Sequence, residues 1–472
     1  MELRRLDQPF PRLLKEEDLA RIHEAALRVL AAHGLRVRSA SARRAAARAG
    51  LRVEADRVFP TLAQVEDLVA RTRAAGGRAA AEPGPPEPLI HLYVPSYPEF
   101  VHDLDRDEIV PYTTERLVEM TKLVDALADQ RVVGAAPGVA LDVPGPLQQL
   151  HTYRIAARYA RHGRRPVEER HPRAMPYVME MAEALGWPHR YHDVYVVSPL
   201  SLGGDSLTCL ETCRDRFERV QVSNMSSVGA SAPIGLAHAL ALGAAEVMAA
   251  TLVVEALAGL PTDWSVRVCP FNPRAMAISL GSPEEFLFQR ASTELTAWYH
   301  GRPPGPPAGM MHTQAKLPDA QAQIERASQM MLCTLFGARG ISGAGALSLD
   351  EVFSAEQLVL DCELRDHTER LLRGADLSCD SETLLAEVSE GLESGFLGLE
   401  TTAARYPEVY WLPRLFERRS CSAWLQAGAS KLSDRARERV RALIAAHDYQ
   451  LDPAVAAELD RIFARAEREL LS

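Results

Sequence analysis

The segment GMMHTQAKLPDAQAQIE, residues 309–325, places side chains that could bind a ligand directly before a predicted helix. His312 could donate a hydrogen bond or carry a proton, and Gln314 could both donate and accept hydrogen bonds. A single histidine is also a common structural residue that hydrogen-bonds its neighbours. The two residues are therefore candidates for substrate binding, provided that the fold places them where a ligand can reach them.

Arg267 is another candidate, because it lies in the otherwise apolar run WSVRVCPFN, residues 264–272. A buried charge needs a partner of opposite sign. The partner could be a carboxylate of a ligand, which fits the planar fork of a guanidinium group. It could equally be an internal acid such as Glu246 or Glu325, and a third alternative is that Arg267 points outward into solvent.

Five further residues could contribute to binding because of their type and place. Phe271 and Asn272 follow Arg267 in the next loop. Tyr406, Tyr410 and Trp411 form an aromatic cluster late in the chain. Aromatic faces attract cations, so this cluster could surround an ammonium group or contact a partner protein. Alternatively, it fixes the C-terminal segment to the rest of the fold.

The elements that must position these residues are short apolar runs that alternate with amphipathic helices. Eight such runs are predicted to be strands: 131–137, 164–169, 193–200, 219–227, 263–270, 308–313, 339–345 and 395–402. Eight strand–helix alternations are typical of a (β/α)8 TIM barrel, whose active sites lie at the carboxyl ends of the strands. Residues 312–316 occupy that place. A doubly wound sheet is the alternative, but no glycine-rich nucleotide motif follows the first run.

Helix signals support the intervening segments. Ser282 and Glu285 fit a capping box, with Pro283 in the first turn. Ser354 and Gln357 repeat the same spacing. Acids within apolar helices, namely Glu246, Asp361 and Glu363, are expected to accept hydrogen bonds from buried backbone or arginine groups.

The chain is predicted to consist of three parts. Residues 14–34 form an amphipathic helix that ends at Gly34, and strand-like pieces and further helices follow. The proline-rich stretch AAEPGPPEPLIH indicates a linker. We therefore expect a helical appendage at 1–90, a barrel at 91–430 and a charged helical tail at 431–472.

Composition excludes several classes of protein. A formal net charge of −10 argues against a nucleic-acid partner. The seven scattered cysteines indicate reduced thiols in a cytoplasm, and MELRRLDQPF lacks the apolar core of a signal peptide. Cys209 and Cys213 lie one helical turn apart, but no second pair has ligand spacing, so no metal site is expected. The apolar run 234–260 contains Glu246 near its middle, which favours a buried helix over a membrane span.

Four ordered segments resemble the trimethylamine methyltransferase family. They read HEAALRVLAAHGLRV, GASAPIGLAHALALGAAEVMA, AKLPDAQAQIERA and YWLPRLFERRSCSAW, and the resemblance extends from about residue 14 to the end of the chain. It implies a TIM barrel that takes a methyl group from a methylated amine. The acceptor it implies is the Co(I) cobalamin-type corrinoid of a separate corrinoid protein, so this chain would hold no cofactor tightly. A homo-oligomer is also expected.

The sequence resembles the branch of this family that lacks pyrrolysine, whose members act on quaternary amines such as glycine betaine. It departs from the family pattern because no histidine lies between 395 and 411. A quaternary ammonium cannot be hydrogen-bonded, so its recognition would rest on shape and aromatic faces, with Arg267 for a carboxylate. The expected function is corrinoid-dependent methyl transfer from a quaternary or other N-methylated amine. The alternative is a catalytically inactive binding protein of the same family.

Overall fold

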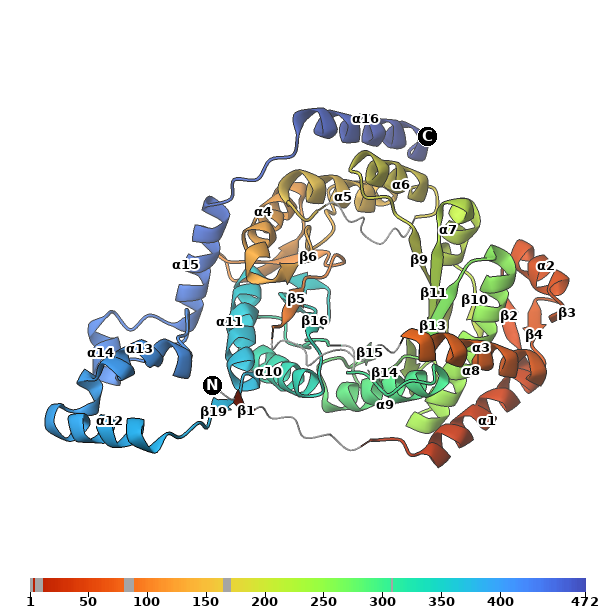
Figure 1. Cartoon of the computed structure of the whole chain (residues 1–472). Helices are drawn as coiled ribbons and strands as arrows, with labels where there is room; N and C mark the ends of the chain where they lie inside the picture. The colour runs from red at the N-terminus through yellow and green to blue at the C-terminus, as the bar shows by residue number, and fades with distance from the viewer. Residues whose placement is uncertain (1–2, 5–11, 80–88, 164–170, 307–308) are drawn as a thin grey trace.

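The computed structural model describes residues 3–4, 12–79, 89–163, 171–306 and 309–472. It is a mixed α/β structure in which helices surround short parallel strands (Figure 1). The predicted strand at 164–169 lies outside the described residues. The helices around the strands are α4 (Thr114–Ala126), α5 (Gln148–Tyr159), α6 (Met175–Ala184), α7 (Asp205–Cys213), α8 (Leu236–Ala258), α9 (Pro283–Tyr299), α10 (Ala320–Leu335) and α11 (Ala355–Leu372).

Six of the parallel strands form two groups of three. In one, β11 (Arg219–Ser223) lies between β9 (Tyr191–Val197) and β13 (Thr262–Ser265). In the other, β5 (His91–Tyr93) lies between β8 (Val132–Val133) and β16 (Gly340–Ser342). Alternate residues along β9 and β11 are buried. This period of two indicates that one face of each strand packs on the helices while the other faces the centre of the ring.

Five of the predicted strands are confirmed in position, those beginning at 131, 193, 219, 263 and 339. The segment 308–313 contributes a single parallel bridge, between Met310 and Ser342. The strand predicted at 395–402 is wrong, because a 3-10 turn (Phe396–Gly398) and α13 (Glu400–Val409) occupy it. The alternation of Leu and Gly in this segment resembles the pattern of a strand, which explains the wrong prediction. Strand β5 was missed because it directly follows the proline-rich stretch.

The N-terminal helix is confirmed as α1 (Glu16–His33), and its cap Gly34 has a positive φ of 57°. The N-terminal region continues the β9 sheet through β10, in the order β9–β10–β2–β4–β3. Its other elements are β2 (Leu35–Val37), α2 (Ala40–Arg48), β3 (Arg52–Glu54), β4 (Arg57–Phe59) and α3 (Leu62–Ala79), and β10 is Ser201–Leu202.

Helix α8 is the long apolar helix expected at 234–260. It is long and apolar enough to cross a membrane, but 72% of its most apolar window is buried inside the protein. Helices α1 and α2 pack against it from one side. The prediction of a buried core helix is therefore confirmed.

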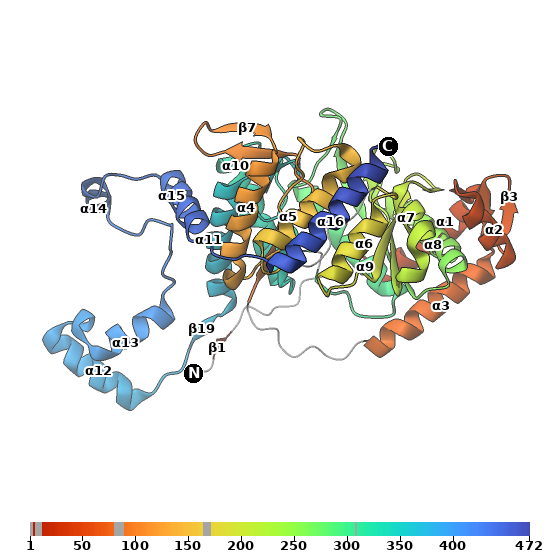
Figure 2. The same ribbon diagram turned by 90° about the horizontal axis from the view of Figure 1, so that it is seen from above.

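The C-terminal region forms an arm and a tail. The arm, α12 (Ser381–Ser394) with α13 and α14 (Cys421–Gln426), extends away from the ring in both views (Figures 1 and 2). The tail helices α15 (Leu432–Ala445) and α16 (Pro453–Leu470) pack on the outside of the ring, against α4 and α11 and against α5 and α6. The remaining strands are β1 (Leu3–Arg4), β6 (Phe100–Asp103), β7 (Glu108–Pro111), β12 (Ser226–Val228), β14 (Val268–Asn272), β15 (Ala277–Ile278), β17 (Ala346–Leu347), β18 (Val352–Phe353) and β19 (Ala375–Asp376).

A buried ion pair joins α10 to α11. Arg326 and Asp361 are both inaccessible to solvent, and Nε of Arg326 donates to Oδ1 of Asp361 at 2.8 Å. The same guanidinium donates to the carbonyls of Met311, Gly343 and Ala346 at 2.8–2.9 Å. Asp361 also accepts from the backbone N–H of Gly345. The pair therefore fixes the two loops that follow the Met310 bridge and β16.

Replacing Asp361 with Ala is expected to lower the free energy of unfolding by about 3–5 kcal/mol, because it leaves the Arg326 charge buried without its partner. Urea unfolding measures this change. Glu458→Ala, which breaks an exposed pair with Arg461 on α16, serves as the control and is expected to change stability little. Equal effects of the two substitutions would contradict this role of Asp361.

Candidate functional site

His312 is buried where the chain leaves the Met310 bridge. Its Nδ1 donates to Oε1 of Glu285 at 2.6 Å, since a carboxylate can only accept. The side chain of Gln329 holds the His312 backbone by accepting from its N–H and donating to its carbonyl. Within the described residues, Nε2 of His312 has no hydrogen-bond partner.

Glu285 has a different role from the one predicted. Ser282 does not cap α9 with its side chain, and its buried hydroxyl has no partner among the described residues. The carboxylate of Glu285 turns inward instead. It accepts from the backbone N–H of Gly281 at 2.6 Å and from Nε2 of Gln289 at 2.8 Å, in addition to His312. The sequence analysis missed Glu285 as a site residue because its spacing also fitted a capping box.

Arg267 lies in the break between β13 and β14. The backbone N–H groups in this break donate to side chains instead of to a neighbouring strand. The N–H of Val266 donates to the Thr296 hydroxyl, and the N–H of Arg267 donates to the Asn224 amide oxygen. The guanidinium is half-buried, and its Nη2 lies 3.2 Å from Sδ of Met310. Within the described part of the chain, no carboxylate pairs with this guanidinium.

Neither of the two acids considered as internal partners pairs with Arg267. Glu246 accepts from groups at the ends of β9 and β11. Glu325 accepts from the Thr313 hydroxyl at 2.5 Å and from the backbone N–H of Gln314 at 3.0 Å. A thioether sulfur is a weak acceptor and carries no charge to balance a guanidinium. The arrangement therefore leaves a cation available to an anionic ligand.

Met310 connects Arg267 to the His312 group. Its Sδ also lies 3.2 Å from Nε2 of Gln289, which in turn donates to Glu285. Arg267, Met310, Gln289, Glu285 and His312 thus form one continuous series of contacts at the carboxyl ends of the strands. The structure therefore links Arg267 and His312, two of the residues predicted to bind the substrate, through one series of contacts.

Gln314, Phe271 and Asn272 were also predicted to bind the substrate, and they differ in whether their side chains remain available at the site. Gln314 is half-buried and donates to the Ile278 carbonyl at 2.6 Å, which ties it to β15 beside the site. Phe271 and Asn272 lie on β14 and pair with β15. Asn272 is exposed, and its side chain accepts from the N–H of Arg274 in a local turn. Gln314 and Phe271 therefore border the site, whereas the Asn272 amide is already engaged.

The late aromatic cluster does not lie at this site. Tyr406 on α13 and Tyr410 directly after it pack on each other in the arm, where they are 48% and 62% exposed. Trp411 contacts His367 of α11 and Phe416 edge-on. The expected cluster above the strand ends does not form, because the segment before it is helical and leads into the arm.

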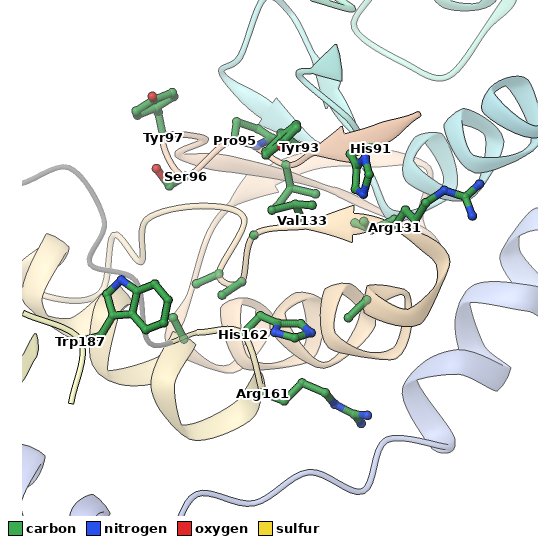
Figure 3. A pocket seen from close by; sticks show the side chains of 17 residues that line it. His91, Tyr93, Pro95, Ser96, Tyr97, Arg131, Val133, Arg161, His162 and Trp187 are labelled. Carbon is green, nitrogen blue, oxygen red and sulfur yellow. The ribbon is translucent and has the colours of Figure 1, made fainter. Parts of the chain in front are cut away.

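A cavity of about 690 Å³ adjoins β5 and β8. Figure 3 shows Tyr93 and Tyr97 on one side of it and Trp187 and His162 on the other. Tyr93 is separated from Met310 by one strand, since β16 pairs with β5 and Ser342 bridges Met310. Sequence reasoning missed Tyr93 because β5 was not recognised as a strand, although the alternation in HLY was a usable signal.

Two thiols near the site are poor nucleophiles. Burial raises the pKa of Cys269, despite the opposing effects of a hydrogen bond with Ser227 and of the nearby Arg267 charge. Burial also raises the pKa of Cys333 to about 11. Both thiols stay protonated near neutral pH, so the site offers binding groups rather than a thiolate.

Polar and charged side chains thus converge after parallel strands, which is where α/β enzymes usually place their ligand-binding sites. The family model described as "Trimethylamine methyltransferase (MTTB)" matches residues 2–470. The chain belongs to this family.

Individual relatives agree with this assignment. A glycine betaine methyltransferase of Desulfitobacterium hafniense is 23% identical over 98% of both chains. A trimethylamine methyltransferase of Methanosarcina acetivorans is 31% identical over 53% of this chain, and the match spans about half (50%) of that relative's length. A crystal structure of the Methanosarcina barkeri monomethylamine methyltransferase has 12% identity and a TM-score of 0.40, covering 93% of this chain and 89% of that one.

Replacing Glu285 with Ala is expected to destabilise the protein by about 1–3 kcal/mol for each buried donor that loses its acceptor. The donors are the Gly281 N–H, Nε2 of Gln289 and Nδ1 of His312. Urea unfolding of Glu285→Ala is compared with that of Glu284→Ala, the exposed neighbour on the same helix. If both variants unfold at the same urea concentration, the inward contacts of Glu285 do not hold the site.

Proposed function

We propose that this chain transfers a methyl group from an N-methylated amine that carries a carboxylate, a quaternary amine above all, to the Co(I) corrinoid of a separate protein. The observation that carries this proposal is Arg267, a half-buried guanidinium beside the site without a carboxylate partner in the described residues. Similarity along the whole chain to a glycine betaine methyltransferase supports the same substrate class.

We also propose that the strands form a closed (β/α)8 barrel. The order β8–β5–β16 followed by the Met310 bridge, together with the order β9–β11–β13, supports it. Pairing of the first strand, β5, with the last, β16, is the contact that closes a barrel. In this arrangement β5 is the first of the eight strands and 395–402 is not a strand, so Met310 belongs to the seventh strand rather than the sixth.

The two ends of the substrate would need different surroundings. Its carboxylate would accept from the fork of Arg267, and the His312 ring would border the same ligand. Its ammonium would rest against aromatic faces such as Tyr93, each contact contributing about 0.5–2 kcal/mol. His312 would bind rather than act as a base, because the leaving nitrogen of a quaternary amine needs no proton.

The chemistry of transfer is a displacement at the methyl carbon. The corrinoid cobalt supplies the electron pair for the new bond to carbon, and the electrons of the broken C–N bond remain on nitrogen, giving a neutral tertiary amine. This chain would orient the methyl group and exclude water. The exposed rim Asn272–Met276 beside the site supports access by a macromolecular acceptor.

The remaining expectations also form part of the proposal: a cytoplasmic protein, without nucleic-acid or membrane partners and without a tightly bound metal, that forms a homo-oligomer. Oligomer formation is supported by the arm, because exposed apolar patches of this kind usually mark interfaces. Its exposed apolar residues include Leu384, Leu385, Leu392, Phe396 and Leu397.

The reaction can be tested by mixing the chain with a reduced corrinoid protein and a panel of methylated amines. We expect glycine betaine and related zwitterions to convert Co(I) to methyl-Co(III), which absorbance spectroscopy follows, and trimethylamine and tetramethylammonium to react far more slowly. If no methylated amine reacts but zwitterions bind in calorimetry, the inactive binding protein is the correct alternative. A preference for amines without a carboxylate would contradict the role given to Arg267.

Replacing Arg267 with Lys is expected to raise KM for the zwitterion about tenfold or more and to change kcat little. The lost fork contributes to ground-state and transition-state binding alike. Steady-state methylation kinetics measure both constants. The control is Arg44→Lys, at an exposed residue of α2 in the N-terminal region. An unchanged KM in Arg267→Lys, with the fold intact by circular dichroism, would make Arg267 a structural residue.

A further inference from the structure

Glu246 is a carboxylate in the middle of apolar α8, and no solvent reaches it. No cation pairs with it in the described part of the chain. Its Oε1 accepts from the backbone N–H of Leu200 at 2.8 Å. Its Oε2 accepts from the Ser198 hydroxyl, from Nδ2 of Asn224 and from the Ser226 hydroxyl at 2.8–3.0 Å. The acid thus joins the carboxyl ends of β9 and β11 to the helix behind them.

Asn224 transmits this contact to Arg267. Its Nδ2 donates to Glu246 at 2.9 Å, and its Oδ1 accepts from the Arg267 backbone N–H at 2.9 Å. The N–H of Ser226 donates to the Arg267 carbonyl at 3.3 Å, so the peptide groups on both sides of Arg267 are held. Gly243 leaves room for the Asn224 amide, since a Cβ there would lie 2.8 Å from Nδ2.

We infer that Glu246 is a positioning residue for Arg267, acting through Asn224, and that this pair sets the selectivity for substrates that bear a carboxylate. The inference rests on the proposed function of Arg267. It follows from the order of donors and acceptors. The Leu200 N–H is a fixed donor, so Glu246 must present an acceptor to it and a second acceptor to the amide group of Asn224. Only then does Asn224 present its oxygen to Arg267.

Replacing the carboxylate of Glu246 with an amide reverses this order of donors and acceptors. In Glu246→Gln the carbonyl must remain opposite the Leu200 N–H, so the new NH2 group faces the NH2 group of Asn224. If Asn224 rotates to accept from it, its own NH2 group then faces the N–H of Arg267, and that hydrogen bond is lost. In Asn224→Asp the two carboxylates face each other and repel. Either single substitution therefore disturbs the Arg267 backbone.

The combination of the two substitutions restores the pattern. In Asn224→Asp with Glu246→Gln, the Gln NH2 group donates to one Asp oxygen while the other Asp oxygen accepts from the Arg267 N–H. The net charge is the same as in the original protein. If Glu246 and Asn224 only filled space in the core, the second substitution would not be expected to restore this pattern of hydrogen bonds.

The experiment measures KM for glycine betaine and for tetramethylammonium in the original protein, the two single variants and the double variant. Each single variant is expected to raise KM for glycine betaine about tenfold and to leave that for tetramethylammonium unchanged, while the double variant regains most of the loss. Glu255→Gln, on the same helix but paired with Arg71 at the surface, is the matched control. A double variant no better than the single variants, or equal losses for both amines, would overturn the inference.

A second measurement separates this inference from the proposed function. Hydrogen exchange of the Arg267 amide, followed by mass spectrometry, is expected to accelerate in Glu246→Gln and to slow again in the double variant, with or without methyl transfer. Absence of methyl transfer in the original protein together with this exchange pattern would refute the function and keep the positioning role. Unchanged exchange in Glu246→Gln would refute the positioning role whatever the activity. If Glu246→Gln does not fold, the Asn224→Asp variant alone and its rescue by the second substitution carry the same test.

Discussion

The buried pair of Arg326 and Asp361 is the interaction on which the site depends. A guanidinium has five N–H donors, and here they serve one carboxylate and the carbonyls of three residues, Met311, Gly343 and Ala346. The carbonyls of Met311 and Gly343 lie where the chain has left a strand, and that of Ala346 lies on the short strand β17. A neutral side chain could not satisfy so many acceptors from one point. The position of His312, one residue after Met311, follows from this arrangement.

Elsewhere around the ring, buried acids hold loops in a similar way, with a carboxylate that accepts hydrogen bonds in place of a guanidinium that donates them. Glu285, Glu325 and Glu246 each lie on a helix and accept hydrogen bonds from backbone or side-chain donors where a strand or loop ends. Because these acids are occupied in holding loops, they do not neutralise Arg267. The positive charge that remains next to Met310 is thus a consequence of how the other charges are used. A site that recognises an anion can be built in this way within a chain whose net charge is −10.

Much of this could be predicted from the sequence, and the failures have physical reasons. Short apolar runs that alternate with amphipathic helices predicted five of the strands, and unusual residue types in or after such runs pointed to Arg267 and His312. The spacing of Ser282 and Glu285 was ambiguous, since a carboxylate three residues into a helix can turn to the cap or to the core. That choice depends on Gly281 and His312, which only the tertiary structure brings close. The arm could not be predicted either, because the Leu–Gly pattern at 396–399 fits both an extended and a helical backbone.

The packing of α1 and α2 on α8 has a consequence for how the chain can be divided. A shortened protein that began after the proline-rich stretch would retain the two groups of three parallel strands, those around β11 and around β5. It would also leave in water one side of a helix whose composition resembles that of a membrane span. Such a fragment would be expected to aggregate before it could be assayed. The N-terminal region therefore acts as a cover for α8, and, because that helix carries Glu246, residues near the start of the chain lie one helix away from the binding site.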